Sequence, residues 1–378
     1  SATNLLNKKL ADCEYSKDLD QERFFVYLRH LKTQLQLFRE ENISLAQQTQ
    51  LLSNEYATTI GAMTIEHEGK EYTLPQTSIF LQNQDSRLRK EIYEKVNIRR
   101  LQDRDKLNDL FSKLLKIRHQ MALNAGYENY RDYMFAELGR FDYAVKDCEQ
   151  FHEAIKTEVI PLVNKIYQKR KQQLQAAQLF PYDLEVDPQN HPALHPFKTE
   201  EEFIEKTIKC LHKVDPMFAQ SISIMNEMQH LDLNSRKGKA PGGYNMTLPE
   251  TGVPFVFMNA AGTQRDLETI VHEAGHAVHS FLMRNLPYNF DMEIASMSME
   301  FLSIEGWDVF YSDEDKKRAV ESHLVGTITM LPWIALIDKF QHWIYTNPEH
   351  TNEARENKWE ELHKELSSEI IDWTPYSD

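Results

Sequence analysis

The sequence predicts a mainly α protein, a multi-helix fold that also contains one β-hairpin and a small β-sheet. Three observations support this prediction. The 378 residues include only 12 glycines, and they are rich in Leu, Glu, Lys and Gln, which favour helices. Long stretches carry apolar residues at helical spacing, whereas the alternation typical of strands is confined to short stretches. A chain of this length forms one large or two moderate domains, and we expect an N-terminal helical region over 1–198 and a second region over 199–378.

These patterns also place the individual elements. Helices are expected over six stretches, residues 22–53, 86–124, 141–177, 199–228, 313–346 and 353–371. A β-hairpin is expected near 63–74, because two alternating segments flank a Glu-Gly-Lys turn. The apolar run 253–258 predicts one further strand, and Pro254 restricts that strand to a sheet edge or places the proline at a strand end.

One short motif, His-Glu-Ala-Gly-His at 272–276, has the spacing of a metal site. His272 and His276 lie four residues apart, which places them on one helix face, separated by about 40° of rotation and roughly 6 Å of rise. That spacing lets two imidazole nitrogens reach one zinc ion at ~2.0–2.1 Å. Glu273 points about 100° around the helix, where it can take a proton from a water at the metal. Gly275 costs such a helix about 1 kcal/mol relative to Ala, which suggests that another element packs closely there.

Two histidines leave a catalytic zinc site short of one protein ligand. A second helix is expected to start near Asp291 and to carry Glu293, Ser296 and Glu300 on one face. We expect Glu293 to be the third ligand and Glu300 to orient a ligand histidine, with Ser296 beside them. His279 shares the face of the two histidines. Three donors along one straight helix span about 10 Å, however, so a place in the pocket wall is favoured for His279.

These motifs belong to a longer pattern. It comprises Gly242-Gly243-Tyr244, Pro254 to Asn259, Gly262-Thr263, His272 to His279, and Glu293 to Glu300. In this order the motifs resemble the oligoendopeptidase F and thimet oligopeptidase family of zinc metallopeptidases, and weaker similarity reaches upstream to residues 72–75 and 125–133. The resemblance implies a helical shell around a deep channel that admits peptides. Tyr244 and Phe257 are further candidates for the pocket.

The chain departs from the family pattern in two places. The interval from His276 to Glu293 is several residues shorter than the family leads us to expect. The family's substrate-closing tyrosines should lie beyond Asp378, and the first residues begin well inside the usual family sequence. We therefore expect the central and catalytic portion of a family member, without either family terminus.

Composition limits the partners that we expect. With 43 basic and 58 acidic residues the net charge is −15, so no general attraction to nucleic acid or to anionic membranes is expected. No uninterrupted apolar run reaches membrane-spanning length. The three cysteines, Cys13, Cys148 and Cys210, are scattered. We expect them to form neither a metal cluster nor a disulfide framework, as in the reducing cytoplasm.

The expected function is that of a zinc-dependent endopeptidase that hydrolyses internal bonds of short peptides with one Zn²⁺ ion. Region 199–378 would then be the catalytic zinc-binding region, with Glu273 as the general base. A free strand edge at 253–258 would let an extended peptide add to the sheet. Two alternatives stay open, a zinc-binding or helical interaction domain without activity, and a zinc carboxypeptidase. The sequence leaves the side-chain preference, the peptide length and the oligomeric state undecided.

Overall fold

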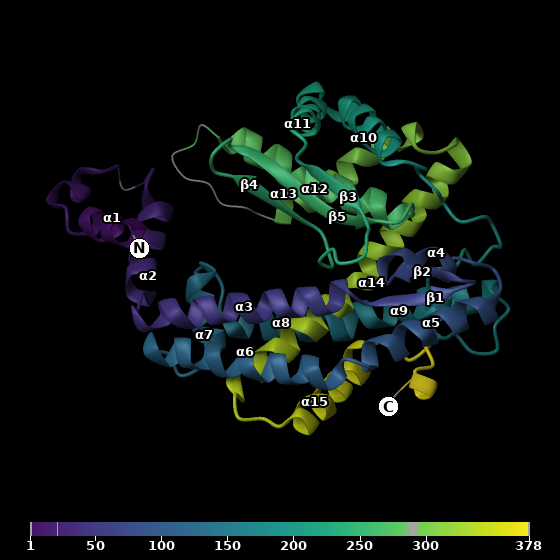
Figure 1. Ribbon diagram of the computed structural model, residues 1–378, viewed down its shortest axis with the longest axis horizontal. Coiled ribbons are helices and arrows are strands. Elements are labelled where there is room, and N and C mark those ends of the chain that lie inside the picture. Colours follow the sequence, from purple (N-terminus) through teal and green to yellow (C-terminus); the bar gives the residue numbers. More distant parts are fainter. Residues whose placement is uncertain (1, 21, 285, 287–292, 377–378) are drawn as a thin grey trace. The chain divides into compact units, whose positions relative to one another are not determined.

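The computed structural model describes residues 2–20, 22–284, 286 and 293–376, and Figure 1 shows their arrangement. The α-helices are α1 Ala2–Ala11, α2 Phe25–Leu37, α3 Glu41–Gly61, α4 Ser78–Leu81, α5 Ser86–Leu101, α6 Arg104–Asn124, α7 Tyr130–Glu137, α8 Val145–Ala154, α9 Ile160–Gln173, α10 Glu200–Val214, α11 Pro216–Glu227, α12 Gln264–Met283, α13 Glu293–Leu302, α14 Asp313–Thr346 and α15 Asn352–Leu366. The strands are β1 Thr64–His67, β2 Lys70–Thr73, β3 Leu231–Asn234, β4 Tyr244–Leu248 and β5 Val253–Ala260. The fold is mainly α with two small sheets, as the sequence predicts.

Short helical turns of other types join these elements. The 3₁₀ turns are η1 Glu14–Asp18, η2 Pro75–Thr77, η4 Pro181–Asp183, η5 Ser303–Val309 and η6 Thr374–Tyr376. The turn η3, Ile155–Val159, is a π-helix between α8 and α9. Such turns are rare and occur often at functional sites.

The chain forms two compact units, and each unit is discontinuous in sequence. Unit 1 comprises Ser1–Tyr56, Arg104–Val163 and Met330–Ser368, and unit 2 comprises Ala57–Asp103, Asn164–Thr329 and Glu369–Asp378. The boundary expected near residue 198 falls inside unit 2. A single boundary at residue 198 would make each unit one continuous segment. Each unit instead consists of three segments that are far apart in sequence.

Unit 1 is helical and contains two apolar clusters. One lies where α2, α6 and α7 meet and consists of Leu37, Ala122, Ala125 and Tyr133. The other joins η3, α14 and α15 through Ile155, Ala335, Leu336, Leu362 and Leu366. These side chains are at most 7% exposed, so both sets of helices are held by close packing.

The larger apolar core belongs to unit 2 and surrounds a three-stranded sheet. Its strand order is β3-β5-β4, with β5 parallel to β3 and antiparallel to β4. Helix α12 packs against β5 and β4 of this sheet, and α13 packs against α12 (Figure 1). Fully buried residues of the core include Phe203, Leu211, Val256, Leu267 and Trp307.

The position of β5 corrects one expectation. Pro254 is the second residue of β5 and pairs with Thr247 of β4, so the proline does sit at a strand end. The strand itself is central, because β3 and β4 occupy both of its sides. A free edge at 253–258 is therefore wrong. The two neighbouring strands, β3 and β4, come from residues before 253, so the apolar run 253–258 gives no information about them.

The first sheet is the expected hairpin. Strands β1 and β2 pair antiparallel, with Thr64 opposite Thr73 and His67 opposite Lys70. Glu68 and Gly69 connect them with φ angles of 50° and 73°. Two successive positive φ angles are what the tight turn between right-twisted strands requires, and glycine adopts them without steric cost.

Helix α14 is the longest helix, at 34 residues. It contains an 18-residue window of mean hydropathy 1.4, of which 22% is buried. Length and composition alone would allow this helix to cross a membrane, which a search for uninterrupted apolar runs misses. Three of its residues, Ala319, Ala335 and Leu336, lie in apolar cores. A helix that packs in a protein core can have the same length and mean hydropathy as a membrane-spanning helix.

Helices α12 and α13 touch at Gly275. A Cβ atom at this position would lie 2.6 Å from Cα of Ser296, 2.7 Å from the carbonyl oxygen of Ala295 and 2.9 Å from Cβ of Met299. These neighbours belong to the backbone or stay close to it, so they cannot move aside as a long side chain can. The close approach that a glycine inside the His-x-x-x-His motif predicts is therefore present.

We expect Gly275→Ala to destabilise the protein by about 1–3 kcal/mol, because the added methyl group forces α12 and α13 apart. Gly326→Ala is the matched control, since among the described residues nothing lies within 4 Å of a Cβ at this position of α14. That replacement should stabilise by about 0.4–1 kcal/mol. Urea unfolding followed by circular dichroism measures both, and equal stability of the two variants would contradict the close packing.

Candidate metal centre

Helix α12 begins with a cap that holds its first turn. The Asp266 carboxylate accepts hydrogen bonds from the backbone N–H groups of Ala261, Gly262 and Thr263, at 3.0, 2.8 and 2.7 Å. These donors precede the helix, so the carboxylate fixes the path by which the chain leaves β5 and enters α12. The rest of the helix is largely buried. The histidines therefore stand on a rigid element.

The structure brings His272, His276 and Glu293 together. One ligand atom from each lies within 4.8 Å of the others. The carboxylate oxygen Oε2 of Glu293 is 3.4 Å from Nε2 of His272 and 3.6 Å from Nε2 of His276. Ligand atoms arranged tetrahedrally at ~2.1 Å around an ion are roughly 3.4 Å apart. The three side chains therefore fit a zinc ion in both chemistry and spacing.

Two residues of α13 support this set of three. The hydroxyl of Ser296, which is fully buried, has two acceptors in Glu293, the backbone carbonyl at 2.8 Å and Oε2 at 3.1 Å. The Glu300 carboxylate bonds Nδ1 of His272 at 2.6 Å. This second bond leaves Nε2 of His272 facing Glu293, and a carboxylate behind a histidine is the usual way in which a metal ligand is oriented.

The electrostatics of His272 follow from the same contacts. Burial lowers the pKa of His272, but the hydrogen bond and charge of Glu300, with the charges of Glu273 and Glu293, outweigh burial and hold this pKa above its usual value. The site thus gathers negative charge around one imidazole. A cation bound there would be attracted by the same three carboxylates.

Sequence reasoning missed three further members of this network, His323, Glu268 and Gln264. His323 of α14 is 3% exposed and lies between two carboxylates, 3.7 Å from Glu300 and 3.6 Å from Glu268. The side chain of Gln264 donates to Glu268 at 3.2 Å. A continuous polar chain therefore backs the metal-facing groups. His323 lies 47 residues beyond His276, so no local spacing signal connects the two.

Glu273 lies outside the ligand group but beside it. Its residue is 6% exposed, and its oxygen Oε1 would be 3.5 Å from a Cβ at Gly243, just before β4. Asn245 of β4 donates a hydrogen bond to the backbone carbonyl of Glu273 at 3.3 Å. The start of β4 therefore runs directly past this carboxylate.

The remaining candidates occupy other positions. His279 is half-buried and belongs to none of the metal-ligand groups found among residues 2–20, 22–284, 286 and 293–376. Tyr244 and Phe257 face each other across β4 and β5 as stacked rings, with centroids 4.9 Å apart. The ammonium of Lys239 lies 4.5 Å from the centre of the Phe257 ring. Asp291, where α13 was expected to start, lies outside the described residues, and α13 is described from Glu293.

The described residues thus bring together a His-x-x-x-His pair on α12 and a glutamate from α13. This is a residue set that can hold a metal ion, and a further glutamate follows the first histidine. Residues 79–377 match Peptidase family M3. Because this match covers most of the chain, the protein belongs to that family.

Known relatives agree with this assignment. An oligoendopeptidase F homolog of Borreliella burgdorferi (strain ATCC 35210 / DSM 4680 / CIP 102532 / B31) is 28% identical over 241 residues, which cover 60% of this chain and 39% of the relative. Among solved structures, a putative oligoendopeptidase F superposes with a TM-score of 0.92 at 27% identity, covering 98% of this chain and 67% of that one. PZ peptidase A, solved with an inhibitor, gives 0.93 at 26% identity, covering 99% and 67%. The chain thus spans about two fifths of the curated relative.

We expect Glu293→Gln to weaken zinc binding roughly tenfold or more, because it removes a charged ligand, and His279→Ala to weaken it much less. Zinc affinity is measured by competition with a chelating dye. Both variants keep α12 intact, so a difference between them reports ligation. The reverse order would show that His279, not Glu293, completes the site.

Proposed function

We propose that this chain hydrolyses internal bonds of short peptides with one zinc ion. The observation that carries this proposal is the meeting of His272, His276 and Glu293 at ligand spacing, with Glu273 next to them. Membership of Peptidase family M3 supports a peptidase, and the names of the relatives support an oligoendopeptidase.

In this proposal His272, His276 and Glu293 hold the zinc ion. Zinc in such a site supplies Lewis acidity, which lowers the pKa of a bound water to about 7 and polarises a carbonyl. Ser296 holds the Glu293 carboxylate toward the histidines, and Glu300 holds His272. Each of these contacts fixes the orientation of a proposed ligand.

Glu273 is the proposed general base. Its carboxylate accepts a proton from the attacking water and returns that proton to the nitrogen of the leaving amine. The neighbouring residue His272 and the passing strand β4 keep the carboxylate close to the site. A group with this role has to be near the metal without binding it, which matches the absence of Glu273 from the ligand group formed by the described residues.

The peptide is proposed to bind along β4. This strand pairs with β5 on one side and forms the edge of the described sheet, and its residues are exposed or half-buried. An extended peptide can add there by backbone hydrogen bonds that ignore side-chain identity. The proposal replaces β5 with β4 because β5 is paired on both sides.

The proposal extends to the surroundings in which the protein works. With a net charge of −15 the protein gains no general attraction to nucleic acid or anionic membranes. Cys13, Cys148 and Cys210 form no disulfide among the described residues, which supports a cytoplasmic location.

An internally quenched peptide blocked at both ends distinguishes this function from the alternatives. Cleavage of the blocked peptide, with products identified by mass spectrometry, is the expected result. Cleavage that requires a free C-terminal carboxylate would indicate a carboxypeptidase instead. Absence of cleavage in zinc-loaded protein would favour a binding domain.

Glu273→Gln keeps the side-chain volume and removes the proton acceptor. We expect turnover to fall by roughly 10²–10⁴-fold, or about 3–5 kcal/mol in the barrier, while zinc content stays at the wild-type level. The exposed Glu314 offers a control, since Glu314→Gln on α14 makes the same chemical change away from the site. Substantial residual cleavage would rule Glu273 out as the base, and loss of zinc would show that Glu273 shapes the site directly.

A further inference from the structure

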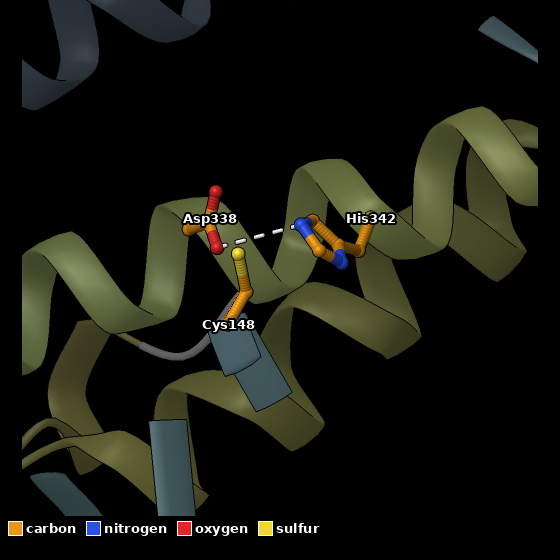
Figure 2. Close-up of side chains that lie close together, drawn as sticks. All are labelled: Cys148, Asp338 and His342. Carbon is orange, nitrogen blue, oxygen red and sulfur yellow. Dashed lines mark ion pairs between the residues drawn. The ribbon is translucent and has the colours of Figure 1, made fainter. Parts of the chain in front are cut away.

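We propose a second metal site in unit 1, formed by Cys148, Asp338 and His342, that takes a zinc-like divalent transition-metal ion. One ligand atom from each of these residues lies within 4.8 Å of the others. Figure 2 shows the thiol, the carboxylate and the imidazole turned toward one another. The sequence predicts scattered cysteines outside any metal cluster, so this gathering appears only in the fold.

Two helices supply the group, and each does so with the same spacing. Cys148 and His152 lie four residues apart on α8, and Asp338 and His342 lie four residues apart on α14. Residues at i and i+4 share one helix face. Each helix thus presents a pair of potential ligands, and the rings of His152 and His342 are 5.7 Å apart between centroids.

His152 positions the carboxylate. This residue is 3% exposed, and its Nε2 atom is hydrogen-bonded to Oδ2 of Asp338 at 2.7 Å. A buried group that holds a ligand carboxylate from behind is characteristic of protein metal sites. The two sites are alike in this respect. In the candidate metal centre of unit 2 a carboxylate, Glu300, orients the histidine ligand His272, and here a histidine, His152, orients the carboxylate ligand Asp338.

One nitrogen of His342 has no hydrogen-bond partner in the part of the chain that the structure describes. This atom, Nε2, is buried and lies 3.5 Å from Oδ2 of Asp338. A buried imidazole nitrogen left without a bond costs free energy. An ion bound to Cys148, Asp338 and His342 would satisfy that nitrogen.

The donor set selects the kind of ion. Thiolate and imidazole ligands favour Zn²⁺ and its neighbours over Mg²⁺ and Ca²⁺, which prefer oxygen ligands throughout.

A reactive cysteine is the competing interpretation of the same three residues. It would leave Nε2 of His342 without a hydrogen-bond partner among the described residues. The metal interpretation accounts for the thiol, the carboxylate and this nitrogen together.

The proposed ion would join α8 to α14. The π-turn η3 begins directly after α8, and Ile155 of this turn packs with Ala335 and Leu336 of α14 in one apolar cluster. The site would thus reinforce a contact that is already packed, which is a structural role. It requires none of the groups proposed for peptide hydrolysis.

Cobalt provides a direct test, because a thiolate bound to Co²⁺ gives a near-ultraviolet charge-transfer band. None of the three proposed ligands of the centre in unit 2 is sulfur, so the band reports the Cys148 site alone. We expect the cobalt-loaded protein to show this band and Cys148→Ser to lose it. Cys13→Ser is the matched control in unit 1 and should keep the band.

Zinc content after dialysis against metal-free buffer gives an independent measurement. We expect two zinc ions per chain in the wild-type protein, and one in either His276→Ala or Cys148→Ser. His342→Gln and Asp338→Asn should each weaken the second ion at least tenfold, which keeps the test available if Cys148→Ser does not fold. One zinc ion per wild-type chain, or a cobalt band that persists in Cys148→Ser, would overturn the proposal.

Discussion

The contact between α12 and α13 at Gly275 is the constraint on which the candidate metal centre depends. With no side chain at this position, Cα of Ser296 comes close enough that even a methyl group would collide with it. The contact lies between His272 and His276 on one helix and between Glu293 and Glu300 on the other. It therefore brings a carboxylate to each end of the histidine pair. Without this approach the motif would have two ligands and no third.

The close approach also explains why the supporting residues come from α13. Ser296 contacts Oε2 of Glu293, the oxygen that faces the histidines, and Glu300 bonds Nδ1 of His272. Glu300 in turn lies beside His323, which lies beside Glu268. Buried polar groups are costly unless each has a partner, so the network limits how the histidines can turn. Site geometry is thus a product of helix packing as much as of the motif.

Some of this could be predicted from the sequence, because the relevant spacing is local. The pair His272 and His276 and the face carrying Glu293, Ser296 and Glu300 follow from helical periodicity, and the hairpin follows from its turn residues. The predicted helix 199–228 is instead two helices. The Asp215 carboxylate caps a new helix by accepting a hydrogen bond from the N–H of Met217, and Pro216 takes the first position of that helix, which proline favours. The central position of β5, the role of His323 and the discontinuous units depend on contacts between distant segments, which periodicity does not record.

The two metal sites show how far such a prediction can reach. Both proposed sites use residues four apart on one helix, a ligand from a second helix, and a buried partner that orients one ligand. At 272–276 the proposed base, Glu273, directly follows the first histidine, so one short motif contains two of the proposed ligands and the proposed base. The second site splits its pairs between α8 and α14, separated by about 190 residues, as the numbers of Cys148 and Asp338 show. Each pair alone is unremarkable, because two side chains at i and i+4 are common on any helix. Cys148, Asp338 and His342 become a possible ligand set only because α8 and α14 pack together. The packing of distant helices cannot be derived from the periodicity of a single sequence.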